Sequence, residues 1–261
     1  MKCLLCLFFF VSSLGFSQSS INAIFIDSLT IKETEFIGFD AYKDYYYITN
    51  NVFHKQTNQQ NLVYKNVALG KITKIDILNP LQLVLLYKDF NAVVLLDNQL
   101  NETNRILGNT IETPISFEFT GLASSNQFWF FDVFSQKIGL YQFKNNSLRF
   151  ISTPLVAIPK VHQNNYNHYL WIDTYNDFFS INLFGKIQKI GKIPEADVIK
   201  IIDSERLLLK IGQSLYYYNL TDYSSKKIEL NENSFVNFFF KDGILSIFTQ
   251  NKITNYKIIL P

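Results

Sequence analysis

Short, mostly apolar segments rich in aromatic residues recur at nearly regular intervals along the chain. They begin at residues 45, 83, 128, 169, 207 and 244, so successive starts lie 37 to 45 residues apart. Each is followed by a polar turn and by another segment, which in several cases alternates apolar and polar residues, as in 138–143. Alternation with period two indicates a half-buried strand, and Asn, Asp, Gly and Ser favour the turns between strands. The pattern therefore predicts six β-hairpins.

Further strand-like segments flank most of these hairpins. An earlier strand is predicted at 72–78, 115–119, 198–202 and 235–240, and a later one at 62–65, 148–152, 187–193 and 226–230. Four strands every 40 to 50 residues are typical of propeller blades. The sixth segment reaches Pro261 before its fourth strand, whereas an opening strand at 21–26 belongs to no segment. We therefore predict an all-β, six-bladed β-propeller whose N-terminal strand closes the last blade and covers its free edge.

Two other architectures are compatible with many short strands. One is a different soluble β fold, and the other is an outer-membrane barrel, whose strands need about 9–11 residues with one lipid-facing side. The predicted strands mostly have four to seven residues, and many are apolar on both faces. Blades stack face to face, so both faces of their strands can be buried. The double-sided apolar strands favour the propeller.

The N-terminus resembles an export signal. Lys2 precedes the apolar run 4–10, and Gly15-Phe16-Ser17 forms a small-x-small cleavage pattern that places the cut before Gln18. The run is shorter than the roughly 20 residues of a spanning helix, although an uncleaved anchor is the alternative. We predict a signal peptide at 1–17, a single propeller domain at 18–261, and a location in the periplasm, at the cell surface or outside the cell.

Cysteine content and charge narrow the chemistry of the mature chain. The chain's two cysteines, Cys3 and Cys6, both lie within the predicted signal, so no disulfide or lipid-attachment cysteine is expected after cleavage. The formal net charge is +2, and no basic stripe of the kind that binds nucleic acid is present. Hydrophobic residues make up 48% of the chain, including 25 Phe and 15 Tyr. The composition therefore predicts a large core, no nucleic-acid partner and no membrane span in the mature chain.

The repeated units resemble a known group of proteins. The segments 127–132 (QFWFFD) and 137–141 (KIGLY) are similar to exported β-propeller-like proteins of Bacteroidetes, loosely to the NHL and YncE-like propellers. The Gly-His and Trp-Asp marks of WD40 repeats and the glycine pairs of kelch repeats are absent. The resemblance implies a propeller fold and an exported protein. It carries no functional residue over to this chain.

Residues that could hold a metal or perform catalysis are sparse in the sequence. His162 and His168 lie six residues apart with no Cys or Glu at a zinc spacing, so the segment 162–168 is interpreted as a solvated polar loop. Asp173 and Asp177 flank a segment without the glycine of a calcium loop, which indicates a hairpin turn. No Gly-x-Ser-x-Gly motif or glycine-rich phosphate loop occurs. We predict no catalytic residue, no metal site and no cofactor.

Aromatic residues within the predicted turns stand apart from the many aromatics in the strands. Phe90, Phe134 and Tyr175 follow the second strands of blades two, three and four, and in a propeller such turns gather on one face. Exposed aromatic side chains are frequent anchors of protein partners. The predicted binding face combines these aromatic residues with the neighbouring aspartates, and its members are Asp89, Phe90, Asp132, Phe134, Asp173 and Tyr175.

The function predicted on these grounds is a secreted, non-catalytic binding or scaffold module of the cell envelope, with an envelope protein or a glycan as its partner. The alternative is a propeller enzyme, either a lactonase-like hydrolase or a glycan-active enzyme, with a metal or paired acids at the central channel. Fold alone does not decide between them, because function lies in the sites carried by a fold.

Overall fold

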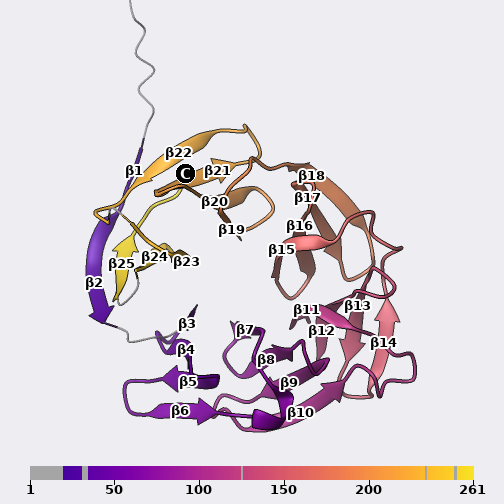
Figure 1. The fold of residues 1–261 in the computed structure, drawn as a ribbon. Coiled ribbons are helices and arrows are strands. Elements are labelled where there is room, and N and C mark those ends of the chain that lie inside the picture. Colours follow the sequence, from indigo (N-terminus) through magenta and orange to yellow (C-terminus); the bar gives the residue numbers. More distant parts are fainter. Residues whose placement is uncertain (1–19, 31–34, 125, 233, 250–251) are drawn as a thin grey trace, which may run out of the picture.

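A computed structural model describes residues 20–30, 35–124, 126–232, 234–249 and 252–261. Six separate β-sheets stand around a central axis as the blades of a propeller (Figure 1). The predicted six-bladed all-β architecture is therefore confirmed. The predicted signal peptide, residues 1–17, lies outside the described residues. Within these ranges no helix has the length and apolar character needed to cross a membrane.

The strands of each blade run antiparallel from the axis outwards (Figure 1). Blade one contains β3 (Glu35–Phe39), β4 (Tyr45–Thr49), β5 (Val52–Gln56) and β6 (Asn61–Tyr64). Blade two contains β7 (Lys74–Asn79), β8 (Gln82–Tyr87), β9 (Ala92–Leu96) and β10 (Glu102–Leu107). Blade three contains β11 (Phe117–Leu122), β12 (Gln127–Asp132), β13 (Lys137–Gln142) and β14 (Ser147–Phe150).

The second half of the ring repeats this arrangement. Blade four contains β15 (Pro159–Asn164), β16 (His168–Asp173), β17 (Asp177–Asn182) and β18 (Ile187–Lys192). Blade five contains β19 (Val198–Ile201), β20 (Arg206–Ile211), β21 (Ser214–Asn219) and β22 (Ser225–Glu229). Blade six contains β23 (Asn237–Lys241), β24 (Ile244–Phe248) and β25 (Lys252–Lys257). The one helical element of the described residues is a short 3₁₀ turn at Val67–Leu69.

The N-terminal segment closes the ring by joining two blades. β1 (Ile21–Asn22) pairs in parallel with β22 at the outer edge of blade five. β2 (Ile24–Thr30) then runs antiparallel to β25 and becomes the fourth strand of blade six. The predicted closure of the last blade is thus confirmed, and the predicted strand 21–26 is divided between blades five and six. The first segment of the fold therefore supports its last sheet (Figure 1).

The cores lie between neighbouring blades, because successive side chains of a strand point to opposite faces of its sheet. In β8, Leu83 and Leu85 pack against blade one, whereas Val84 and Leu86 pack against blade three. Similar apolar clusters fill the other junctions from blade three to blade six. At the junction of blades six and one, the ring of Phe36 lies 4.8 Å from that of Phe248. Burial on both faces explains the double-sided apolar strands in the sequence.

Candidate functional site

The turns of the propeller lie at two opposite ends of the ring. Turns between the second and third strands of blades one to five lie at one end, together with the described connections between successive blades; this end is here called the turn face. Turns between the first and second strands and between the third and fourth strands lie at the opposite end, here called the groove face. This division follows from the antiparallel order of the strands.

The three aromatic side chains predicted as a binding face are exposed on the turn face. Phe90, Phe134 and Tyr175 are 52%, 78% and 64% exposed, and they stand on three consecutive blades. Asp89 is also exposed beside Phe90. The ring of Phe90 leans over the backbone of Gly70, where an added Cβ would come within 3.0 Å of the ring. These exposed rings are available to a partner.

The two predicted aspartates of blades three and four are buried and organise the turns. Asp132 accepts hydrogen bonds from the backbone N–H groups of Ser116 at 2.7 Å and Ser135 at 2.9 Å. Asp173 accepts from the N–H groups of Tyr175 and Asp177, both at 2.9 Å. An Asp side chain that accepts from the backbone N–H groups that follow it, as with Ser135, Tyr175 and Asp177 here, fixes a turn. Asp132 and Asp173 therefore hold the aromatic residues in place, and the segment from Asp173 to Asp177 is the predicted hairpin turn.

Aliphatic side chains extend the apolar character of the turn face beyond the predicted residues. They belong to the connections between blades and to the end of β20. No pattern in the sequence around them indicates that they are exposed. The large aliphatic side chains exposed there are Val67, Val156, Ile158, Ile211 and Val236.

At the axis, blades two and four meet through a polar contact across blade three. The Nζ atom of Lys74 on β7 lies 2.7 Å from Nε2 of His162 on β15. Burial is the main cause that lowers the pKa of Lys74, to about 8. The pKa of His162 lies well below its usual range because the ring is buried and faces the Lys74 charge. The ring is therefore neutral at pH 7, and its Nε2 accepts from the ammonium group.

The prediction that residues 162–168 form a solvated loop is wrong for residues 162–164, which belong to β15, and for His168, which begins β16. The largest departure is at His162. This residue is buried in the innermost strand of blade four, its ring 4.2 Å from that of Phe119, and the turn is confined to the residues that precede β16. Polar residues at 162 and 164 mimic a loop because this strand buries a polar face. Within the described ranges no three His, Asp or Glu side chains converge in the manner of metal ligands.

A second polar contact lies two residues farther along both strands. Asp76 accepts hydrogen bonds from the side-chain amide of Asn164 at 2.7 Å and from the backbone N–H of Leu122 at 2.6 Å. The Asn164 amide also donates to the Leu122 carbonyl at 3.0 Å. Only glycine fits at position 121, since a Cβ there would lie 2.1 Å from the Asn164 side chain. These contacts join blades two, three and four at the axis.

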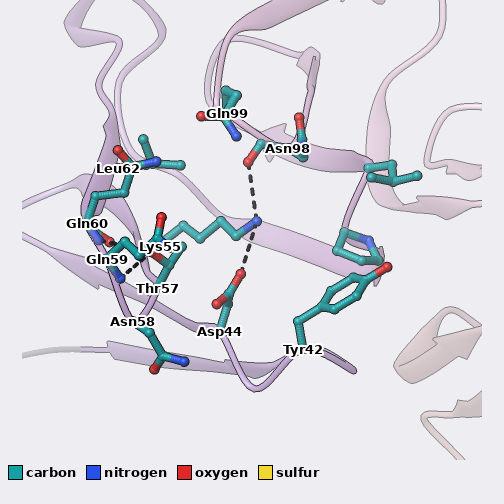
Figure 2. A pocket seen from close by; sticks show the side chains of 12 residues that line it. Tyr42, Asp44, Lys55, Thr57, Asn58, Gln59, Gln60, Leu62, Asn98 and Gln99 are labelled. Carbon is teal, nitrogen blue, oxygen red and sulfur yellow. Dashed lines mark hydrogen bonds and ion pairs between the residues drawn. The ribbon is translucent and has the colours of Figure 1, made fainter.

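The groove face carries a cavity of about 460 Å³ between blades one and two. Figure 2 shows residues of both blades around it. It is lined by Tyr42, Asp44, Lys55, Thr57, Asn58, Gln59, Gln60, Leu62, Pro80, Leu81, Asn98 and Gln99. The lining comes from four turns and from the adjoining ends of β5 and β6, with residues up to 57 positions apart in the sequence, which is why no local pattern marks the cavity.

A buried lysine forms the floor of this groove. Lys55 Nζ lies 3.3 Å from the Asp44 carboxylate and donates to the Asn98 carbonyl of blade two at 3.2 Å (Figure 2). The ammonium also lies 5.7 Å from the centre of the Tyr46 ring. A buried charge is tolerated when it is paired and hydrogen-bonded in this way.

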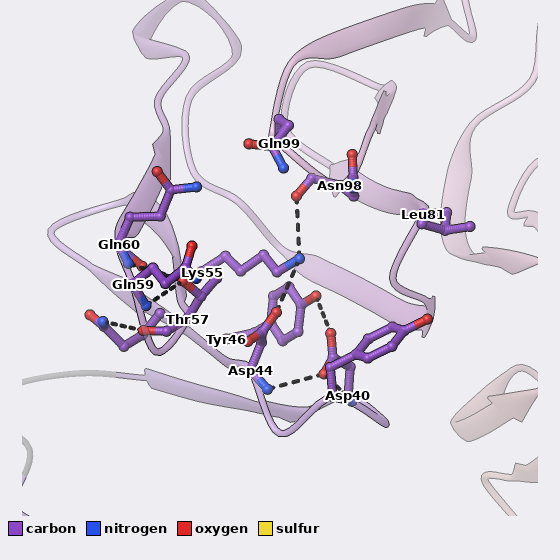
Figure 3. A network of polar contacts seen from close by, with 12 residues as sticks. Asp40, Asp44, Tyr46, Lys55, Thr57, Gln59, Gln60, Leu81, Asn98 and Gln99 are labelled. Atoms are coloured by element: carbon purple, nitrogen blue, oxygen red, sulfur yellow. Dashed lines mark hydrogen bonds and ion pairs between the residues drawn. The ribbon is translucent and has the colours of Figure 1, made fainter.

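The support beneath Lys55 is a chain of hydrogen bonds in blade one. Tyr46 donates its hydroxyl to Asp40 at 2.8 Å, and the other oxygen of Asp40 accepts from the backbone N–H of Asp44 at 3.0 Å (Figure 3). Burial and the bond to Asp40 raise the pKa of Tyr46 far above its ordinary value. The hydroxyl therefore stays protonated and the floor remains fixed.

Comparison with known proteins supports the fold and goes no further. No protein-family model matches the sequence, and no curated protein matches it. A catalytically inactive virginiamycin B lyase from Staphylococcus aureus with quinupristin has 12% identity and a TM-score of 0.57, over 89% of this chain and 99% of that chain. YCF48 bound to D1 peptide has 7% identity and a TM-score of 0.58, over 91% and 99%. BamB from Moraxella catarrhalis has 9% identity and a TM-score of 0.53, over 90% and 99%.

These similarities define the class of protein as a β-propeller. The three solved structures align with 89%, 90% and 91% of this chain. At such low identity no binding or catalytic residue passes from them to this chain.

Proposed function

We propose that the protein is an exported, non-catalytic binding module of the cell envelope that holds an envelope protein on its turn face. In this proposal residues 1–17 are removed as a signal peptide and residues 18–261 form a single propeller. Support for export comes from the signal-like pattern ending at Ser17 and from the resemblance to exported propellers of Bacteroidetes.

The exposed aromatic side chains of the turn face carry the proposal. Phe90, Phe134 and Tyr175 project from turns that are fixed by hydrogen bonds, on blades that pack against one another. Aromatic anchors on a rigid support lose little conformational entropy on binding, and aromatic residues are frequent hot spots of interfaces. A propeller in complex with a peptide is among the similar structures, which supports a peptide or protein partner.

The test replaces all three aromatic residues with alanine. The variant Phe90→Ala/Phe134→Ala/Tyr175→Ala is expected to lose capture of its envelope partner by at least about 100-fold, since each lost hot spot costs about 1–2 kcal/mol or more. Its thermal midpoint should change little, because the three rings are exposed. Capture is measured by quantitative pull-down from an envelope extract of the source cells.

A matched variant removes three exposed aromatic rings from the groove face. Tyr166, Phe184 and Tyr223 lie in turns at that end and are 42%, 90% and 62% exposed. Their triple replacement with alanine should leave capture unchanged. Equal losses from the two triple variants, or no loss from either, contradict the assignment to the turn face.

A further inference from the structure

The groove between blades one and two has the form of a ligand site. The first-to-second and third-to-fourth turns of both blades enclose it, so a ligand lying there touches two sheets at once. Its volume of about 460 Å³ lies within the range of about 300–1,000 Å³ that is usual for small-molecule sites. Only the floor is charged, and that charge is already paired.

The floor offers no free charge to a ligand. Lys55 is 6% exposed and is engaged by the Asp44 carboxylate and the Asn98 carbonyl. The ammonium and the carboxylate neutralise one another, so an anionic ligand would have to break this pair. The groove therefore favours an uncharged ligand.

The rim of the groove consists of side-chain amides from both blades. None of these amide groups hydrogen-bonds to another described residue, although each can donate two hydrogen bonds and accept others. The residues are Asn58, Gln59, Gln60, Asn98 and Gln99. Blade one provides three of them and blade two provides two, so amide groups of both blades line the groove (Figure 2).

Apolar surface completes the lining at one end. The ring of Tyr42 is 70% exposed, and the side chain of Leu81 on the neighbouring blade is 62% exposed. Both lie beside the polar network of the floor (Figures 2 and 3). An exposed ring provides a flat apolar surface for C–H groups, next to amides that bind hydroxyl groups.

We infer that this groove binds a neutral oligosaccharide. Sugar hydroxyls both donate and accept, which matches free amides on two sides, while the C–H face of a sugar ring matches the Tyr42 ring. An extended peptide usually gains affinity by adding its backbone to a free strand edge, whereas the polar groups here are side chains of separate turns. The inference goes beyond the proposed function, because it adds a second ligand class on the opposite face.

The experiment uses the purified chain and an immobilised array of neutral and acidic oligosaccharides, followed by calorimetric titration of the strongest neutral one. Asn58→Ala/Gln99→Ala removes one amide from each side of the groove. With two hydrogen bonds lost, the dissociation constant should rise about tenfold or more. As a matched control, Asn109→Ala/Gln213→Ala removes two exposed amides from the turn face and should bind normally.

The outcomes separate this site from the turn face. The inference is supported if the parent protein retains a neutral oligosaccharide, if the groove variant binds it more weakly, and if the triple aromatic variant of the turn face binds it as the parent does. Three results would overturn it. They are retention of acidic oligosaccharides alone, capture of peptides from a random library with no sugar bound, and equal affinity of the groove variant and the control amide variant for the neutral oligosaccharide. Protein capture by the groove variant should stay normal, so failure at the groove leaves the turn-face proposal standing.

Discussion

A chain that begins at residue 31 is expected to lose the closed ring. It lacks β1 and β2, so β22 and β25 each become an exposed edge. Ile21, which is buried between blades five and six, is lost as well, and burial of one such side chain contributes about 1.5–3 kcal/mol. The deletion also removes the hydrogen bond from the Asn255 amide to Asp27 at 2.7 Å.

The expected size of this effect is large relative to the stability of a domain. Together these losses should lower the free energy of unfolding by at least about 4 kcal/mol, out of a usual total of about 5–15 kcal/mol. The thermal midpoint measured by circular dichroism should fall by about 10 °C or more. Size-exclusion chromatography should show association, because unpaired edge strands recruit other strands.

A matched variant keeps the strand and changes only its surface. Ile26 and Leu29 are exposed on β2, and Ile26→Thr/Leu29→Thr preserves the backbone pairing with β25. Its thermal midpoint should stay close to that of the parent, since exposed substitutions usually cost less than about 0.5 kcal/mol each. A truncated chain that unfolds at the parent temperature and stays monomeric would show that the ring does not depend on this closure.

Replacement of Asp76 with alanine is expected to loosen the axis of the propeller. The buried carboxylate accepts from Leu78 N–H at 2.8 Å as well as from Leu122 and Asn164. Hydrogen bonds to charged groups contribute about 1.5–3 kcal/mol each. Removing the acceptor leaves buried donors on blades three and four, so the free energy of unfolding should fall by about 3 kcal/mol or more.

Asp97 provides the control for this prediction. Its carboxylate also accepts from two backbone N–H groups, those of Gln99 and Asn101, but within a single exposed turn. Asp97→Ala should therefore cost only about 1 kcal/mol in urea denaturation. Equal losses in the two variants would mean that the contacts between blades at the axis add nothing to stability.

The strand repeat could be predicted from the sequence because each blade buries both faces of its middle strands. Leu83 to Leu86 alternate between two cores, and this produces a continuous apolar run that is visible without any structure. The opening strand could also be assigned to the last blade, since a ring that lacks one strand has a single free position. Its division between blades five and six depends on the geometry of closure and has no signal in the sequence.

The contacts that could not be predicted from the sequence are made by buried polar residues of different blades. His162 and Asn164 occupy alternate positions of an innermost strand and find their partners, Lys74 and Asp76, almost 90 residues earlier in the chain. The nearly continuous run of polar residues in 162–168 is typical of a loop, so the buried polar face of β15 was hidden. The same limit applies to Lys55 and Asn98, which meet only because blades one and two are neighbours.

The turn face combines features that could and could not be predicted. The turn residues Phe90, Phe134 and Tyr175 were identified from their place after the second strand of each blade, and they are exposed. The buried roles of Asp132 and Asp173 required the hydrogen bonds of the structure. In these turns the buried aspartates thus fix the backbone conformation, while the aromatic side chains are exposed to solvent.

Photo-crosslinking in an envelope extract tests the turn face most directly as the binding surface. A photoreactive phenylalanine derivative replaces Phe134 on the turn face or Tyr223 on the groove face, both of which are exposed. We expect irradiation to yield a discrete protein adduct from position 134 and none from position 223. Adducts from position 223 alone, the same adducts from both positions, or no adduct from position 134 would contradict the proposed binding face.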